Sequence, residues 1–158
     1  IGWSDEHYAQ VEGGAGSVAG VVGALVGGFL ADRLGVKAIV TFAVLGVSAF
    51  CVLMGVSVEL RTSESFPIIF LLGTTFLISM MTVASFSLFM RLCTAAVAGT
   101  QYTLYMAISN LARVSGAAMV ASLEAEGYRV IFLVMAGAIV LPLVFLFMIK
   151  DEPRELKA

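Results

Sequence analysis

The chain has 158 residues, of which 60% are hydrophobic and only 13% are charged, and its formal net charge at pH 7 is −2. Soluble domains typically carry about 25% charged residues because they present a wet surface, so this composition excludes an ordinary soluble domain. The small negative charge, without any basic cluster or aromatic-interleaved basic patch, excludes a nucleic-acid-binding protein.

Long apolar runs begin close to the N-terminus. The first extends from about residue 5 to 30, and Ser4 is suited to cap it. Acidic side chains fill its first turn, where the helix dipole favours them. A short charged turn at 31–37 separates this run from a second one over about 38–58.

Three further runs complete the pattern. The third covers about 67–90 and begins with a proline, which suits the first turn of a helix. The fourth covers about 101–123, and Gly127 closes the turn that follows it. The fifth covers about 130–149, where Pro142 predicts a kink.

The length of these runs identifies them as membrane helices. Each is about 20 residues or longer, which suffices to cross a hydrocarbon core of about 30 Å. Buried strands also read as apolar runs, but strands are usually shorter than about ten residues. The sequence therefore predicts an all-α integral membrane protein, a bundle of about five transmembrane helices in a lipid bilayer.

Lysine and arginine are distributed unequally between the two sides that alternating loops define. One side has only Arg61 and Arg129, whereas the other collects six basic residues: Arg33, Lys37, Arg91, Lys150, Arg154 and Lys157. The positive-inside rule places the second side in the cytoplasm, together with the C-terminus.

Catalytic and metal-binding patterns are not found in the sequence. It has one His and no HExxH, CxxC, Walker-type loop or GxSxG, and Cys51 and Cys93 read as free thiols in apolar segments. We expect neither an enzyme nor a bound metal or cofactor. The first residue is Ile1, without a charged segment before the first apolar run, so we interpret the chain as truncated at its N-terminus.

A glycine stripe follows the first apolar run. Gly16 and Gly20, and likewise Gly23 and Gly27, have small-xxx-small spacing, which lets two helix backbones approach closely. The stripe predicts either close static packing or a surface that slides and hinges, and static packing is the simpler interpretation.

The most specific motif ends the same run and reads Gly28-Phe-Leu-Ala-Asp32-Arg33-Leu-Gly35-Val-Lys37. Gly28 permits a close crossing, Gly35 permits a tight turn, and Asp32 can accept hydrogen bonds from a helix N-terminus. Arg33 and Lys37 favour retention of this loop on the cytoplasmic side of the membrane. The motif resembles the signature of the major facilitator superfamily, with Val36 in place of a usual basic residue. That resemblance implies a conformational latch between two halves of a transporter; a merely charged turn is the alternative.

The fourth run carries a polar stripe at three- and four-residue spacing, made of Tyr102, Tyr105, Ser109, Asn110 and Arg113. Arg113 lies about halfway along, where a guanidinium costs roughly 2.5–3.5 kcal/mol on insertion scales. It should therefore face a water-filled cavity or a carboxylate. We expect its planar fork to bind an anionic solute, with Asn110, Tyr102, Tyr105 and Gln101 in the same site. The alternative is a structural ion pair with a helix outside this chain.

Two weaker candidates lie in other helices. Thr75, Ser79 and Thr82 form a hydroxyl stripe on the third run, although such groups more often bond to their own backbone. Glu12 lies about two turns into the first run and is suited to bind a coupling proton. It is equally able to extend its carboxylate to the outer interface, so both interpretations of Glu12 stay open.

Beyond the motif, the later part of the chain is similar to one branch of the superfamily, the AmpG-type permeases. Four segments carry this resemblance: Leu88-Phe-Met-Arg-Leu-Cys93, Gly99-Thr-Gln101-Tyr102, Asn110-Leu-Ala-Arg113 with Gly116, and Glu126-Gly127-Tyr128. The third run departs from the branch at Leu72-Gly73-Thr74-Thr75. The resemblance implies proton-driven import of anhydro-muropeptides across the bacterial inner membrane.

Residues 1–158 are thus expected to form most of the C-terminal six-helix half of a major facilitator transporter. Its partners would be the missing N-terminal helices and a small anionic solute. The alternatives are a transporter of another solute (acetyl-CoA, a peptide or a sugar phosphate) and a non-transporting membrane scaffold or sensor. The presence of Asp32 and Arg33 favours transport.

Overall fold

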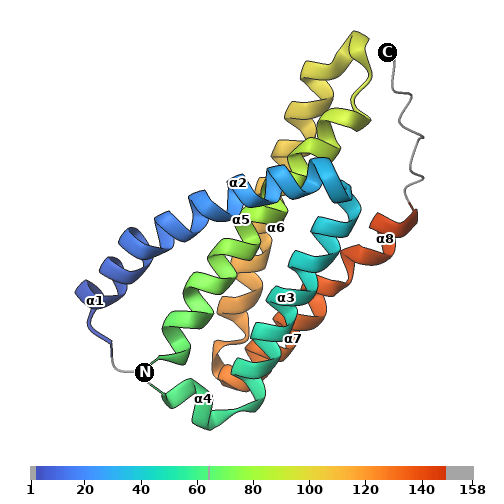
Figure 1. The fold of residues 1–158 in the computed structure, drawn as a ribbon. Coiled ribbons are helices and arrows are strands. Elements are labelled where there is room, and N and C mark those ends of the chain that lie inside the picture. Colours follow the sequence, from blue (N-terminus) through green and yellow to red (C-terminus); the bar gives the residue numbers. More distant parts are fainter. Residues whose placement is uncertain (1–2, 64, 149–158) are drawn as a thin grey trace.

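The structure is a computed structural model that describes residues 3–63 and 65–148, and in this part of the chain all regular secondary structure is helical. Five of its helices are long and apolar enough to cross a membrane, which confirms the predicted all-α membrane fold. They are joined by short turns and alternate in direction (Figure 1). The elements in chain order are α1 (Asp5–Gln10), η1 (Val11–Gly16), α2 (Ser17–Leu34), α3 (Val36–Val56), α4 (Val58–Thr62), α5 (Phe66–Leu92), η2 (Ala95–Val97), α6 (Ala98–Ser122), η3 (Glu124–Glu126), α7 (Tyr128–Val140) and α8 (Pro142–Met148).

The predicted N-cap, the two glycine turns and the proline break are found at the expected residues. The Ser4 hydroxyl accepts the His7 N–H at 3.2 Å and caps α1. Gly35 and Gly127 adopt positive φ angles of 93° and 86°, which glycine tolerates better than any other residue. The last span is interrupted between α7 and α8, immediately before Pro142. Local residue chemistry therefore sets where these helices begin and end.

The helix bounds extend beyond several of the predicted ones. The first span continues to Leu34 rather than residue 30, and α6 begins at Ala98 rather than 101. Hydropathy marks where lipid contact ends, whereas the hydrogen-bonded helix continues into water. The predicted end of the fifth span at Ile149 lies outside the described residues, as do Lys150, Arg154 and Lys157.

The glycine stripe lies at a close crossing of α2 and α5. A Cβ on Gly23 would overlap the main-chain carbonyl of Phe76, and one on Gly27 would lie 2.7 Å from the Cα of Met80. Gly23 and Gly27 are both buried. Only glycine lets the two backbones come this close, so the stripe forms a close helix crossing in this structure.

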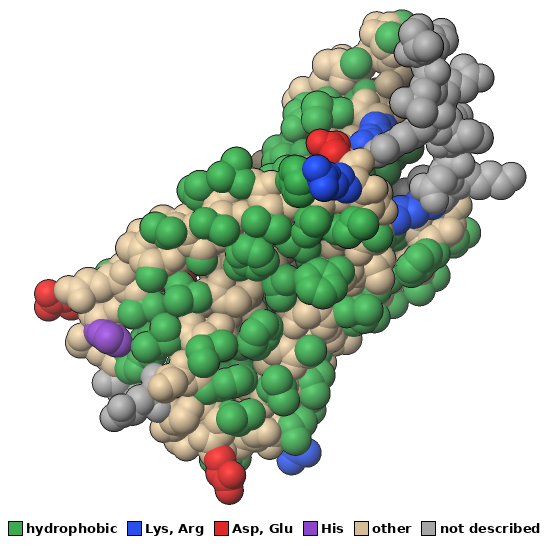
Figure 2. Space-filling model, viewed as in Figure 1, with side chains coloured by type: hydrophobic (Ala, Val, Ile, Leu, Met, Phe, Trp, Pro, Cys, Tyr) green, Lys and Arg blue, Asp and Glu red, His purple; other side chains and the backbone are tan. Residues whose placement is uncertain are grey.

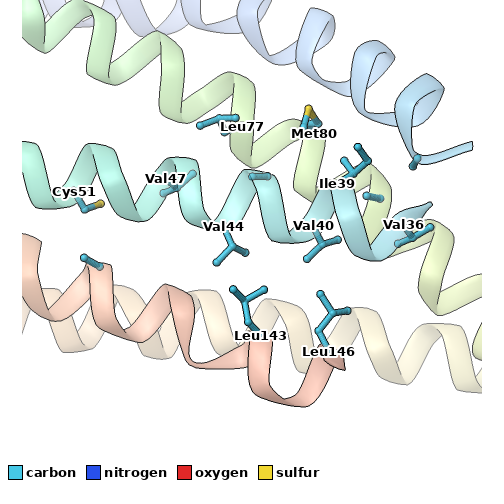
Figure 3. Packing of buried hydrophobic residues seen from close by; sticks show 14 residues of the cluster. Val36, Ile39, Val40, Val44, Val47, Cys51, Leu77, Met80, Leu143 and Leu146 are labelled. Atoms are coloured by element: carbon cyan, nitrogen blue, oxygen red, sulfur yellow. The ribbon is translucent and has the colours of Figure 1, made fainter. Parts of the chain in front are cut away.

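The α3 helix forms the centre of the apolar core. One side of it meets Leu77 and Met80 of α5, and the other meets Leu143 and Leu146 of α8 (Figure 3). The Ser48 hydroxyl also donates a hydrogen bond of 3.1 Å to the Ala136 carbonyl, which ties α3 to α7. The core thus joins four of the five spans through α3 and α5.

The outer surface shows the charge pattern of a membrane protein. In Figure 2, charged side chains gather at the two ends of the visible face and hydrophobic side chains cover the band between them. Many large apolar side chains are exposed, including Leu25 at 71% and Phe42 at 61%. In water such exposure would be costly, whereas in a bilayer apolar side chains can face lipid or other membrane helices. The chain is a multi-pass membrane protein.

Candidate functional site

The residues of the glycine-aspartate motif meet the end of α5. Asp32 lies in the last turn of α2, and its Oδ1 is 4.0 Å from Nη2 of Arg91. The Asp32 and Arg91 side chains are 79% and 46% exposed, so this pair adds less than about 1 kcal/mol to stability. Arg33 places its guanidinium carbon 4.3 Å from the centre of the Phe29 ring. The Asp32–Arg91 pair therefore brings opposite charges together at the ends of α2 and α5 but contributes little to stability.

A cavity beside this pair links it to α6. The cavity has a volume of about 320 Å³ and opens to the surface between the three helices. Gly28 and Asp32 line it from α2, Ser87 and Met90 from α5, and Tyr102 from α6. Tyr102 was predicted to belong to the solute site and Asp32 to the latch, and the structure brings both to one cavity.

The first turns of the polar stripe pack against α5. The Tyr105 ring lies 5.2 Å from the Phe89 ring, measured between centroids, at an interplanar angle of 32°. The Gln101 side-chain oxygen accepts the Thr94 N–H at 2.6 Å and closes the turn before α6. Gln101 is thus engaged with the backbone, a role that its assignment to the solute site did not indicate.

The second half of the stripe is exposed. Asn110 and Arg113 are both exposed, and Arg113 makes no ion pair with any residue that the structure describes. Helical spacing places Arg113 on the same face of α6 as Tyr102 and Ser109. The opposite face carries apolar side chains, among them Leu111, which is 67% exposed, together with the hydroxyls of Ser115 and Ser122. The α6 helix therefore has one strongly polar face and one mostly apolar face.

The hydroxyl stripe on α5 is used in packing. Thr82 donates to the Ile78 carbonyl at 2.8 Å, the expected bond to its own helix. The Ser79 hydroxyl lies 3.3 Å from the position that a Cβ on Gly20 would take, and Thr75 also faces that glycine. These positions belong to the α2–α5 crossing.

Glu12 lies in η1, a π-helical turn where a regular α-helix was predicted. Its Oε2 atom is enclosed and has no hydrogen-bond partner among the described residues. The neighbouring Gln10 donates instead to Glu6, at 3.4 Å. An enclosed carboxyl oxygen without a partner is uncommon and indicates a functional or strained position.

Potential metal ligands do not converge anywhere in the described part of the chain. No group of three or more His, Cys, Asp or Glu side chains is placed to hold an ion within residues 3–63 and 65–148. Cys51 is buried in the core at α3, and Cys93 lies in the turn after α5. Both thiols are free.

Comparison with known proteins gives a match at the level of a large family. The family model of the Major Facilitator Superfamily matches residues 2–158, which is nearly the whole chain. No curated protein and no solved structure matches it.

Proposed function

This chain belongs to the major facilitator superfamily of secondary transporters, and we propose that it contributes to the proton-coupled import of a small anionic solute. Within that superfamily we assign residues 1–158 to the C-terminal six-helix half, with the N-terminal helices of the same transporter as its partner. Anhydro-muropeptides are the solute class that the AmpG-like segments favour. Their carboxylates can pair with an arginine, and their sugar rings can stack on tyrosine rings.

The exposed arginine within the fourth span is the observation that carries the proposal. A guanidinium at this depth is stable only beside water, an anion or a carboxylate, and none of the described residues supplies the carboxylate. Arg113 would bind an anionic group of the solute through two parallel hydrogen bonds. Asn110 lies about one turn before Arg113 on the same helix, and its side-chain amide N–H would donate a hydrogen bond to the solute. Solute would then bind near the midplane, between the two halves of the transporter.

Tyr102, Tyr105 and Gln101 would extend this site toward the Asp32 end of the molecule. Their helix turns pack on α5 through the Phe89–Tyr105 contact, so the rings are held at defined positions. Tyr102 also lines the cavity beside the latch residues Gly28 and Asp32. Because Tyr102 lies beside both sets of residues, this arrangement supports a coupling in which solute binding at α6 affects the conformation of the latch.

We further propose that the Asp32 end faces the cytoplasm. Arg33, Lys37 and Arg91 lie at that end, against Arg61 and Arg129 at the other. This asymmetry supports the orientation because basic residues are retained on the cytoplasmic side. With the AmpG-like segments, it supports a bacterial inner membrane as the location.

The Asp32–Arg91 pair predicts a charge-reversal phenotype. We expect Asp32→Arg to lower the initial uptake rate about tenfold or more, because two like charges then meet at the helix ends. The double variant Asp32→Arg with Arg91→Asp should recover much of the rate, since it restores an opposite pair. Initial uptake by membrane vesicles measures both. A double variant as inactive as Asp32→Arg would show that the pair has no role in the cycle.

The solute class is tested with the complete transporter in proteoliposomes under an inward proton gradient. We expect accumulation of labelled anhydro-muropeptide that stops when a protonophore collapses the gradient. A labelled sugar phosphate and a neutral peptide serve as competing substrates. Uptake of the sugar phosphate alone would replace the muropeptide assignment, and uptake of none would favour a scaffold or sensor.

A further inference from the structure

The cavity beside Asp32 offers three kinds of contact to a ligand. Phe86 and Tyr102 contribute aromatic rings, Ser87 and Tyr102 contribute hydroxyls, and Asp32 contributes a carboxylate. The rest of the wall is small or apolar and consists of Gly28, Ala31, Val83 and Met90. A mostly apolar wall with a few polar groups is the usual lining of a site that binds a small molecule.

The volume of the cavity limits the size of that molecule. At about 320 Å³ it lies near the lower end of the range of roughly 300–1,000 Å³ that small-molecule pockets span. The cavity therefore has room for a single substituted ring but not for a whole conjugate of sugar and peptide. A ligand bound here is either one small molecule or one part of a larger solute that extends through the opening.

The charges beside the cavity favour a neutral ligand that is rich in hydroxyls. The Asp32 carboxylate lies 4.0 Å from the Arg91 guanidinium, so the two formal charges offset each other. An anionic ligand would be repelled by the carboxylate, and a cationic one by the guanidinium. A hydroxyl can donate to the carboxylate and accept from the guanidinium. Because a carboxylate has about four acceptor positions, Asp32 can bind a hydroxyl and keep its pair with Arg91.

The aromatic wall of the cavity is held in place by further ring contacts. The ring centroids of Phe86 and Phe89 lie 6.3 Å apart, and the Phe89 ring lies 5.2 Å from that of Tyr105. This row of rings joins α5 to α6, the two helices that carry Phe86 and Tyr102. An aromatic ring held in this way presents a flat apolar surface. The C–H face of a sugar ring can pack on such a surface while its hydroxyls reach the polar groups.

From these observations we propose that the cavity is a second solute subsite, which binds one neutral sugar ring. The sugar packs on Phe86, and its hydroxyls form hydrogen bonds with Ser87, Tyr102 and Asp32. Tyr102 lies about three turns before Arg113 on the same face of α6, which is about 16 Å along the helix. The subsite is therefore separate from the anion contact at Arg113 and lies toward the Asp32 end. This inference rests on the proposed transport function and gives the sugar part of the solute its own contacts.

The subsite is tested by saturation-transfer NMR on the complete transporter, with N-acetylglucosamine as the neutral sugar probe. We expect saturable binding. Ser87→Ala and Tyr102→Phe should each weaken it about threefold to tenfold, because each variant removes one hydroxyl contact. Ser85→Ala is the matched control, since it removes a hydroxyl of the same helix that lies outside the described cavity wall. Binding to this control should equal binding to the unmodified protein.

Three results would overturn the subsite: no binding of N-acetylglucosamine, equal binding in all of these variants, or tighter binding of glucosamine at pH 7. The last result would assign the cavity to cations, because glucosamine carries an ammonium group. Uptake of labelled anhydro-muropeptide is measured separately in proteoliposomes. Sugar binding that depends on Ser87 and Tyr102, in a transporter that imports no solute, would overturn the proposed function alone. Import without such binding would overturn the subsite alone.

Discussion

Replacing Arg113 with alanine should abolish solute uptake while the protein still reaches the membrane in normal amount. A charge-assisted hydrogen bond is worth about 1.5–3 kcal/mol, so losing a bidentate contact should lower the uptake rate about 100-fold or more. Arg113→Lys keeps the charge but loses the planar fork, and we expect weak residual uptake from it. Initial uptake by vesicles, normalised to the transporter in the membrane, measures the effect.

Leu111→Ala is the matched control for that experiment. Leu111 lies on the mostly apolar face of the same helix and, like Arg113, is exposed, at 67%. We expect uptake close to that of the unmodified protein. Normal uptake by Arg113→Ala would refute the solute-binding role. Loss of Arg113→Ala from the membrane would instead support a structural ion pair.

Adding one methyl group at Gly23 should destabilise the whole bundle. The new Cβ would overlap the Phe76 main-chain carbonyl, and a backbone group cannot move aside as a flexible side chain can. Overpacking of this kind costs about 1–3 kcal/mol and sometimes more. Gly27→Ala meets the Met80 backbone and should act in the same way. The midpoint of thermal unfolding of the complete transporter in detergent measures both variants.

Gly137→Ala provides the comparison within α7. A Cβ at Gly137 meets nothing within 4 Å, and alanine favours a helix over glycine by about 1 kcal/mol. We expect an unchanged or slightly higher midpoint from this variant. If Gly23→Ala unfolded at the same temperature as Gly137→Ala, the close α2–α5 crossing would be wrong.

Much of the fold could be predicted because its signals are local. Hydropathy runs locate the five spans, and the capping of α1 by Ser4 follows from residue chemistry at one position. The turns at Gly35 and Gly127 follow in the same way. The glycine spacing of α2 indicated a close helix crossing, but it could not identify α5 as the partner.

The parts that were missed depend on relations between distant residues. The Asp32–Arg91 pair and the shared cavity of Asp32 and Tyr102 arise from the register of α2, α5 and α6, which no single segment encodes. The π turn at η1 differs from an α-helix by one residue and leaves the hydropathy of the span unchanged. Gln101 was predicted to line the solute site, yet its amide oxygen accepts the Thr94 N–H of the preceding turn.

The claim that the Arg113 face of α6 borders water within the membrane is tested most directly by thiol labelling. In the complete transporter with Cys93→Ser, a charged, membrane-impermeant thiol reagent is applied to Ser109→Cys and, separately, to Leu111→Cys. We predict rapid reaction at position 109, slowed by the transported anion, and little reaction at position 111. Equal reaction at both positions, or none at 109, would mean that the polar stripe does not line a solute pathway.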